Sequence, residues 1–553
     1  MKSFLFSEKN EPTSTLKWLF LLSGTALSGL LSVKGSVVWI LASVPCALVA
    51  LWFVVFRFRF LEKTFASFSR WRAALSLVLA AYAAHCYTWI FQDRLYRVAE
   101  ELGNGAIADL IARFGMSISV VIGIVSVLAL FVYLYWFIGW FAQRMRSLAR
   151  SADSAERWFL LIAMILAIVL IPLIYRQTTV FFSPNGGADN VWDKIDIVYS
   201  SDTASLVEQN VFLNIGASEN DIRQPLFGVF AAPFALSASL AVRLMLLPDA
   251  YCPLLQIVQA LLLFLTLVLV SRALRLSGLE KVLFLSLACV SYPSLLFLLN
   301  MEQYIFPVFW LMLLIWQSVS GDPDERDTAW IAASGSMLTS GVFLLLVPKQ
   351  GSPGSRVRAG LSALLKFAIV GLLFGRAAMV ISSAESVLFL TQFAGERLPF
   401  LQRLMQYTTF VASCFVAPAA QVEQYASGIS VFHQSAAVGW SIAGIALFAA
   451  ATAGFALNRK NSFARICFGW VLFSLLLLCV VGWGTFENGL VLYTLYFSWA
   501  FVSLIVLLIR RIFRRQFAAR LAVLSAGIAA LLVCNLQGIA ELLRFGMQYY
   551  PIR

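Results

Sequence analysis

Charged residues are scarce in this chain of 553 amino acids: only 12% are Asp, Glu, Lys or Arg, whereas 61% are apolar. Soluble domains carry about a quarter charged residues. The apolar residues gather in runs of roughly 18 or more, the length that a helix needs to cross the hydrocarbon core of a bilayer. Such runs recur from end to end, for example at Ser36–Phe56 and Met116–Phe141. This composition excludes a soluble globular protein and predicts an all-α polytopic membrane protein with about 13–15 transmembrane helices.

The signatures of several functional classes are missing. The chain has two histidines, His85 and His433, which lie far apart in sequence and argue against a histidine-based metal site. Its eight cysteines form no CxxC pair and lie mostly in apolar runs, so we interpret them as small apolar residues. A P-loop is absent, which argues against ATP-driven transport by this chain alone. We predict no cofactor, and the sequence leaves a requirement for a divalent cation open.

The net charge is +13, and the basic residues gather in short loops between apolar runs. Cytoplasmic loops of membrane proteins carry an excess of Lys and Arg, so this pattern indicates topology rather than nucleic-acid binding. Two long loops with few basic residues, Gln177–Gln224 and Ser383–Gln434, are expected on the opposite, external side. The loops assigned to the cytoplasm are Arg57–Arg72, Arg144–Arg157, Arg459–Arg465 and Arg510–Arg520.

These anchors divide the chain into N-terminal accessory helices (1–157), a core (158–382) with the external loop 177–224, a second external loop (383–436) and C-terminal helices (437–553). Within the first part, Gln92–Gly115 is predicted to be an amphipathic helix on the outer surface, broken at Gly103–Asn104–Gly105. The predicted spans fall near 16–34, 36–56, 72–91, 116–141, 158–175, 251–271, 281–299, 303–319, 361–382, 437–457, 466–482, 490–509 and 521–540.

Two further apolar segments, Pro225–Leu247 and Ala329–Val347, leave the topology of the core open. If neither segment crosses the membrane fully, Arg272 and Lys281 are cytoplasmic and Glu302 is external. If both cross, these sides are exchanged. The excess of basic residues on the cytoplasmic side favours the first arrangement.

The external loop Gln177–Gln224 is strongly acidic and unusually long for a connection between spans, and loops of this length tend to be functional. Asp202 differs from its other carboxylates because it precedes a helix-like run, Ala204–Leu213. An Asp at that position fits two roles. It is a good N-cap for a helix, and it is also suited to act as a general base at the membrane surface.

Basic side chains near the outer surface are candidates for binding an anionic group. Arg376 lies near the outer end of the apolar run Phe367–Ile381, where an arginine either has a function or extends to the headgroups. Arg223 is a further candidate. The external segment Phe393–Tyr425 carries aromatic residues and charges, Arg403 among them, and is expected either to fold over a site or to anchor the chain at the interface.

An acidic residue in the first large outer loop, followed by the step Arg223-Gln224-Pro225-Leu226-Phe227 into the membrane, resembles the GT-C glycosyltransferases. These are multispan enzymes that use polyprenyl-phosphate sugars. In that family the acidic residue of the loop is the proposed base, and the step commonly reads His-Pro-Pro-Leu or Arg-His-Pro-Leu. Gln224 replaces the histidine here, which puts any role of that imidazole in doubt.

Three later segments are similar to the same family, in order and in expected side. The resemblance covers roughly residues 160 to 510. The segments are Ser291–Pro293 followed by Asn300–Tyr304, the glycine-spaced stretch Trp330–Gly341, and Gly482–Gly489 followed by Tyr493 and Tyr496.

The resemblance implies an inverting glycosyltransferase in the bacterial inner (cell) membrane, with its active site on the periplasmic side. The donor would be a polyprenyl-phosphate sugar of the undecaprenyl type, and the acceptor an envelope glycan or lipid. Residues 158–382 would form the catalytic core and Asp202 would be the catalytic base. The substrate-binding residues would be Arg223, Gln224, Glu302 and Arg376.

Two other functions stay open. An oligosaccharide polymerase or ligase would be expected to use Arg and His in its outer loop, whereas this loop is acidic and contains no histidine. A transporter or flippase of lipid-linked sugars usually shows internal repeats and charged or broken helices at the midplane. In this chain the charge is concentrated in one outer loop, which favours an enzyme.

Overall fold

The computed structural model describes Trp18, Leu21 and residues 68–103, 105–182, 197–208, 210–215, 223–320, 326–343, 353–374, 376, 398–425, 428–435, 438–484 and 490–552. Apart from Trp18 and Leu21, the predicted spans near 16–34 and 36–56 lie outside the described residues.

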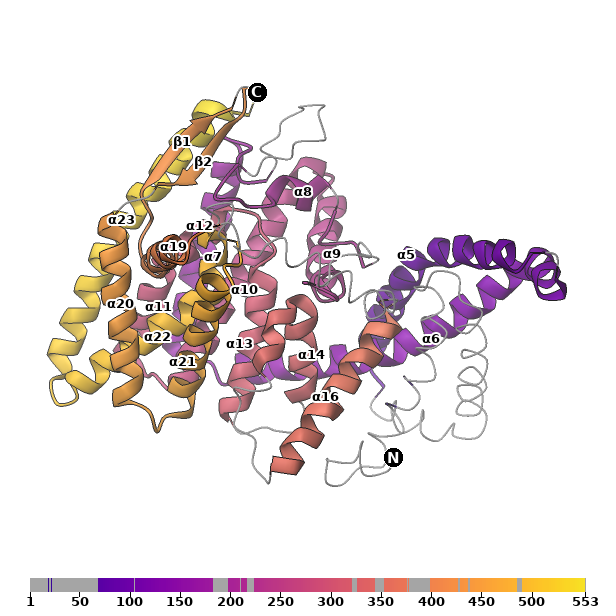
Figure 1. The fold of residues 1–553 in the computed structure, drawn as a ribbon, viewed down its shortest axis with the longest axis horizontal. Helices are drawn as coiled ribbons and strands as arrows, with labels where there is room; N and C mark the ends of the chain where they lie inside the picture. Colours follow the sequence, from indigo (N-terminus) through magenta and orange to yellow (C-terminus); the bar gives the residue numbers. More distant parts are fainter. Residues whose placement is uncertain are drawn as a thin grey trace.

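The described chain is mostly helical (Figure 1). The elements up to residue 299 are α5 (Arg70–Leu102), α6 (Ala106–Arg150), α7 (Ser154–Tyr175), α8 (Thr203–Glu208), α9 (Phe227–Met245), η1 (Pro248–Ala250), α10 (Tyr251–Ala273), α11 (Gly278–Cys289) and α12 (Tyr292–Leu299). The later elements are α13 (Ile305–Ser320), α14 (Arg326–Ser336), η2 (Leu338–Val342), α16 (Pro353–Leu373), α19 (Phe400–Ser413), β1 (Ala420–Gln424), β2 (Ser430–Gln434), α20 (Val438–Leu457), α21 (Ser462–Ser474), η3 (Leu475–Val480, a π-helix), η5 (Leu490–Tyr493), α22 (Thr494–Ile512) and α23 (Phe517–Tyr549).

Among the described residues, eight helices are long and apolar enough to cross a membrane, or up to nine if the bent pair α11–α12 forms one span. Several of them expose apolar side chains on the outside of the bundle. On α7, Leu161 and Ile165 are each about half exposed. Large apolar surfaces of this kind are stable against lipid and not against water. The protein is therefore a multi-pass helical membrane protein, as its composition predicts.

One side of the bundle is marked by a buried ion cluster. Glu156, at the start of α7, is 1% exposed and accepts hydrogen bonds from Arg272 (Nε, 3.0 Å) and Lys281 (Nζ, 2.8 Å). The cluster joins the start of α7 to the end of α10 and the start of α11. Arg272 and Lys281 thus lie on the side of the basic loop Arg144–Arg157, which we call the inner side.

The opposite, outer side carries both long loops. The backbone N–H of Tyr199 donates to the carbonyl of Phe432 at 3.0 Å, and the N–H of Phe432 donates to the carbonyl of Ile197 at 2.8 Å. These bonds attach the first loop to strand β2 of the second. Glu302 also lies on this side, where it contacts Asp202. The structure agrees with the first of the two topologies considered above.

The two ambiguous segments behave differently from full spans. Helix α9 is long enough to cross, but its N-terminus lies against Asn214 and Ile215 of the outer loop. Its C-terminus is joined through η1 to the outer end of α10, where Gln256 bonds the carbonyl of Phe297 at 2.8 Å. Both ends of α9 are thus on the outer side. Helix α14 has 11 residues, too few to span a bilayer.

The predicted span near 281–299 is bent by 60° between α11 and α12. The Ser291–Tyr292–Pro293 step therefore lies within this span and does not end it. A bend frees backbone groups that lipid cannot satisfy. Here Asn535 of α23 donates to the carbonyl of Val290 at 2.7 Å, and the N–H of Tyr292 donates to the carbonyl of Phe415 at 3.0 Å.

The stretch Gln92–Gly115 is helical and broken in the predicted place, but it is not a separate helix. Residues before Gly103 continue α5 and residues after Gly105 begin α6, so the two sides of the break belong to a long helical hairpin. Gly103 ends α5 with φ of 63°, a value that glycine adopts without strain. The hairpin extends away from the main bundle (Figure 1).

The described residues of the segment 383–436 include regular secondary structure, whereas we predict an external loop. It contains α19, whose residues Tyr407–Ser413 are buried in the bundle. It also contains an antiparallel hairpin in which Ala420 pairs with Gln434 and Gln424 pairs with Ser430. Figure 1 shows this hairpin above the helices, beside the end of α23.

Candidate functional site on the outer side

A strained turn positions Asp202. The N–H of Ser201 donates to the carbonyl of Val198 at 2.9 Å, and both central residues, Tyr199 and Ser200, have positive φ (49° and 59°). This is the geometry of a type I′ turn, which normally uses Asn and Gly. For Tyr and Ser it costs roughly 1–2 kcal/mol per residue. Strain of this kind concentrates at functional sites, so the turn directs attention to Asp202.

The strain is held by packing around Tyr199. Its side chain is 3% exposed, and its hydroxyl accepts a hydrogen bond from Tyr292 at 3.0 Å. Its ring meets that of Phe432 edge to face at 5.3 Å. Burial raises the pKa of the Tyr199 phenol above its ordinary value, so the hydroxyl stays protonated. The turn is therefore held between α12 and the β1–β2 hairpin.

Glu302 connects this turn to the membrane helices. Its side chain is fully buried, and Oε1 accepts the backbone N–H of Asp202 at 2.8 Å while Oε2 accepts that of Gln303 at 2.9 Å. Asp202 itself is half-buried and stands directly before α8. The helix there ends at Glu208 and is shorter than predicted. The Glu302 carboxylate thus holds the backbone of an acidic residue that lies 100 positions away in the sequence.

Beside this pair lies a cavity of about 410 Å³, which we call the outer cavity. Gln303 and Tyr304, which directly follow Glu302 in the chain, are part of its wall. The volume falls in the range of about 300–1,000 Å³ that is usual for small-molecule sites. The lining residues are Arg223, Gln224, Gln303, Tyr304, Met337, Leu338, Thr339, Leu477, Val481, Trp483, Tyr493, Tyr496 and Phe497.

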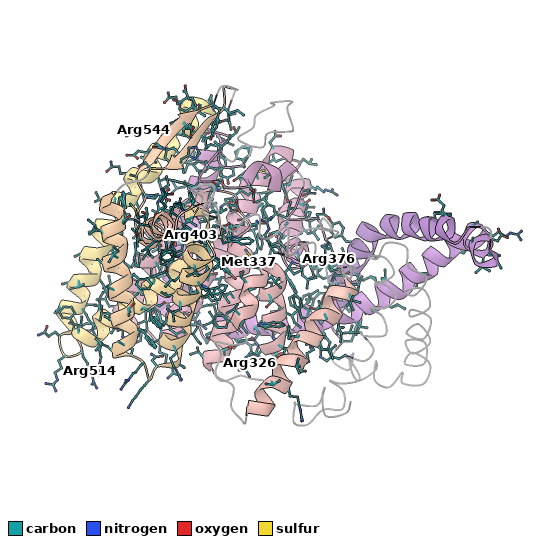
Figure 2. The ribbon with its side chains drawn as sticks, in the orientation of Figure 1. Arg326, Met337, Arg376, Arg403, Arg514 and Arg544 are labelled. Atoms are coloured by element: carbon teal, nitrogen blue, oxygen red, sulfur yellow. The ribbon has the colours of Figure 1, made fainter. Side chains whose placement is uncertain are left out.

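The cavity is formed by several segments that lie far apart in the sequence. The step at Arg223 and Gln224 meets the end of α14, where the N–H of Leu226 donates to the carbonyl of Gly335 at 2.7 Å. A Cβ at Gly335 would lie 2.8 Å from the Cβ of Leu226, so this approach requires glycine. The late outer loop contributes Trp483 and Tyr493. Figure 2 labels Met337, which lines the cavity from the end of α14.

Arg376 lies elsewhere. Its side chain is 5% exposed, and Nη2 donates to the carbonyl of Ile215 at 2.6 Å, at the end of a described part of the outer loop. The lining of the outer cavity includes Arg223 and Gln224 but not Arg376. In the view of Figure 2, Arg376 lies on the side of Met337 that faces the α5–α6 hairpin. Of the predicted substrate-binding residues, Arg223 and Gln224 thus line the cavity, Glu302 lies next to the lining residue Gln303, and Arg376 lies apart. The predicted base Asp202 is not part of the lining either.

One wall of the cavity comes from residues that the sequence does not mark as functional. Leu477 comes from the π-helix Leu475–Val480, and Val481 directly follows it. π-Helical turns are frequent at functional sites, but apolar leucines carry no sequence signal for them. Arg403 of α19 donates to the carbonyl of Val480 at 2.7 Å, so part of the segment Phe393–Tyr425 does reach the site.

A comparison of the chain with protein-family models, characterised proteins and solved structures gives no match. The candidate site therefore stands on its geometry alone: a half-buried carboxylate, a buried carboxylate that holds it, and a cavity with one arginine and several aromatic side chains.

Proposed function

We propose that the protein is a membrane glycosyltransferase of the GT-C type, which transfers a sugar from a polyprenyl-phosphate donor to an envelope glycan or lipid on the external side. The observation that carries the proposal is the contact between Glu302 and the N–H of Asp202 beside the outer cavity. It brings a carboxylate, an arginine and an apolar-aromatic cavity together on one side of the membrane, and this reaction needs all three.

Asp202 is the general base of the proposed reaction. The acceptor hydroxyl attacks the anomeric carbon of the sugar, a carbon–oxygen bond forms, and the bond from that carbon to the lipid phosphate breaks. The proton of the hydroxyl passes to the Asp202 carboxylate, and polyprenyl phosphate leaves. Both oxygens of Glu302 accept backbone N–H groups, so Glu302 acts as a positioning residue and Asp202 takes up the proton.

The outer cavity binds the donor in this scheme. Arg223 lines it and offers a charge for the phosphate, whose negative charge grows as the bond breaks. Gln224, where the resembling family carries histidine, is 6% exposed and offers a neutral hydrogen-bonding group. Trp483, Tyr493 and Tyr496 provide aromatic walls against which a sugar ring or an isoprenoid packs.

Release of free polyprenyl phosphate tests the proposal. The full chain in nanodiscs receives an undecaprenyl-phosphate sugar and an envelope glycan or lipid acceptor, and both products are measured. We expect transfer by the natural protein and a loss on the order of 10²–10⁴-fold in Asp202→Asn, because the amide cannot take up the proton. Asn caps a helix as well as Asp, so the variant should fold normally.

Three results would contradict the proposal. Near-normal transfer by Asp202→Asn at normal expression would remove Asp202 as base and leave it as a helix cap. Passage of the donor across the bilayer without release of polyprenyl phosphate would show a flippase. Transfer of whole oligosaccharide units from a lipid diphosphate would show a polymerase or ligase.

A further inference from the structure

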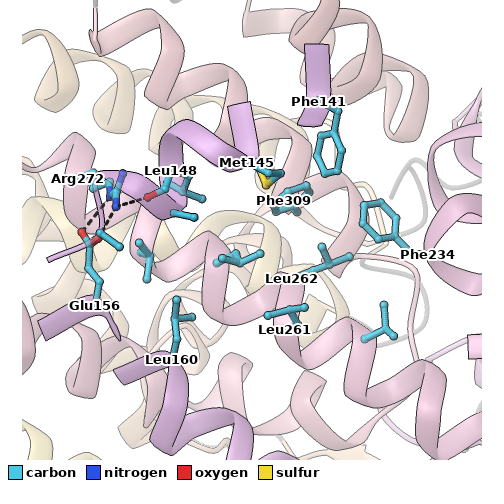
Figure 3. A pocket seen from close by; sticks show the side chains of 15 residues that line it. Phe141, Met145, Leu148, Glu156, Leu160, Phe234, Leu261, Leu262, Arg272 and Phe309 are labelled. Atoms are coloured by element: carbon cyan, nitrogen blue, oxygen red, sulfur yellow. Dashed lines mark hydrogen bonds and ion pairs between the residues drawn. The ribbon is translucent and has the colours of Figure 1, made fainter. Parts of the chain in front are cut away.

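A second cavity, of about 340 Å³, lies on the inner side of the bundle between α6, α7, α9, α10 and α13. We call it the inner cavity. Its volume also falls within the usual range for ligand sites, about 300–1,000 Å³. Its walls are almost entirely apolar, as the side chains in Figure 3 show. The lining residues are Phe141, Met145, Leu148, Ala149, Ala152, Glu156, Leu160, Phe234, Val258, Leu261, Leu262, Leu265, Val268, Arg272 and Phe309.

The two charged residues of the inner cavity neutralise each other. Arg272 Nε donates to Glu156 at 3.0 Å, and Nη2 of the same guanidinium bonds the carbonyl of Leu148 at 3.0 Å (Figure 3). Lys281 pairs with Glu156 at 2.8 Å and also with Asp153, so two cations face two carboxylates. An additional charge placed among these groups would be buried without a partner, which is costly. The part of a guest that enters the cavity must therefore be apolar and uncharged.

Part of the inner-cavity wall is exposed, and exposed basic side chains lie close to lining residues in the sequence. Leu261, in the wall, is 39% exposed, so the cavity is open toward the hydrocarbon region. Arg146 and Arg150 are exposed on the last turns of α6, beside the lining residue Ala149, and Arg157 is exposed next to Glu156. Exposed arginines at the inner membrane surface attract anionic headgroups.

We infer that the inner cavity binds an acyl chain of an anionic phospholipid of the inner leaflet, whose phosphate lies against Arg146, Arg150 and Arg157. The apolar walls select a hydrocarbon chain, and the three arginines select a negatively charged headgroup. This site is on the side opposite to the outer cavity and does not depend on the glycosyltransferase proposal.

Two neighbouring residues on α7 supply a matched pair for the test. Leu160 lines the inner cavity, whereas Leu161 is 50% exposed and is not part of its lining. The purified full chain is titrated with phosphatidylglycerol and phosphatidylcholine and examined by native mass spectrometry. We expect Leu160→Trp to weaken phosphatidylglycerol binding at least about tenfold, the effect of excluding about two methylene groups from an apolar site. Leu161→Trp should bind like the natural protein.

The headgroup is tested separately. Arg150→Gln with Arg157→Gln should reduce the preference for phosphatidylglycerol over phosphatidylcholine by about fivefold for each arginine removed. Arg459→Gln with Lys460→Gln removes two exposed charges from the inner loop between α20 and α21 and should leave the preference unchanged.

Equal binding of both lipids by the natural protein would overturn the inference, as would unchanged binding by Leu160→Trp. If that variant fails to fold, Leu160→Ala, which enlarges the cavity, decides the question. A change in phosphatidylglycerol affinity in Leu160→Ala that Leu161→Ala does not show supports the site. Equal affinity of Leu160→Ala and Leu161→Ala would overturn the inference, because only the general lipid surface of α7 would then be involved.

Discussion

Glu302 shows how a single residue can make a polar site at the membrane boundary stable. An ionised carboxylate with no exposed surface is costly unless it is hydrogen-bonded. Glu302 meets this condition by accepting the N–H groups of Asp202 and Gln303. The bond to the N–H of Asp202 also fixes the end of the strained turn at Tyr199 and Ser200. The carboxylate that carries no proton in the proposed reaction is therefore the one that holds the loop in place.

Replacement of Glu302 should consequently cost stability as well as activity. In Glu302→Ala, two buried N–H groups lose their acceptor, at about 1–3 kcal/mol each. We expect thermal unfolding of the purified protein to shift to lower temperature, by an amount that corresponds to a loss of about 2–6 kcal/mol. Glu302→Gln, which keeps one acceptor oxygen, should lose less.

Glu423 on β1 supplies the control for this comparison. Its side chain is 53% exposed and pairs only with His433 among the ion pairs of the described residues. Glu423→Ala should change the free energy of unfolding by no more than about 0.5 kcal/mol. Equal thermal stability of Glu302→Ala and Glu423→Ala would show that the bonds of Glu302 contribute nothing to the fold.

At the scale of elements, the inner ends of several helices are joined by charged groups. Beside the cluster around Glu156, Glu280 at the start of α11 pairs with Arg510 at the end of α22 at 3.0 Å. Arg510 also donates to the carbonyl of Leu274 at 3.2 Å. These contacts link α7, α10, α11 and α22. Basic residues that the sequence marks as topology signals thus also hold helix ends together.

Asp153 makes this cluster sensitive to acid. Partial burial pushes the pKa of Asp153 up, but the hydrogen bonds from Lys281 and the Glu156 N–H, with the charges of Lys281 and Arg272, outweigh it. The pKa of Asp153 therefore lies below its ordinary value of 3.8. A carboxyl whose pKa is depressed by folding contributes stability above the unfolded pKa, and this contribution is lost as the pH falls through the folded pKa.

The variant Asp153→Asn isolates this effect, because Asn still caps α7 but cannot pair with Lys281. The Asp153 side chain is 42% exposed, so we expect a loss below about 1 kcal/mol at neutral pH. The difference from the natural protein should vanish at a pH well below 3.8. Unfolding is followed across this range with Asp249→Asn, an exposed residue of η1, as the control. A difference that stays constant down to the lowest pH would contradict the ion-pair explanation.

At the scale of the whole molecule, the outer cavity belongs to both halves of the chain. Arg223 and Tyr304 come from the predicted core 158–382, whereas Trp483 and Tyr496 come from the predicted C-terminal part 437–553. The hydroxyl of Tyr496 lies 2.6 Å from that of Ser340 across this division. A functional site built in this way requires both halves to insert so that their cavity-lining residues lie on the same side of the membrane.

This membrane topology can be tested by labelling single cysteines with an impermeant maleimide. The exposed Cys534 is first replaced by Ser. Asn214 and Val422 are exposed in the two outer loops, and Arg459 is exposed on the inner side. We expect Asn214→Cys and Val422→Cys to react in intact cells, and Arg459→Cys to react only after permeabilisation. Opposite behaviour of the two outer positions would break this topology.

The sequence by itself determined properties that depend on a short stretch of residues: apolar spans, the side of basic loops and helix breaks. The apolar runs predict α7, α10 and α20 nearly to the residue, because burial in lipid depends on the composition of each segment alone. The basic residues at Arg272 and Lys281 predict the inner side through their local charge. The glycines at Gly103 and Gly105 predict a helix break because of their backbone freedom.

Only the tertiary structure decided where apolar segments end and what their ends meet. Hydropathy describes α9 as a span, but contacts with Asn214 and the start of α10 keep both of its ends on the outer side. The outer cavity likewise brings together residues that lie far apart in the sequence, from Arg223 to Phe497. The contact of Asp202 with Glu302 is set by packing between distant residues, and no local composition or periodicity encodes such a pairing.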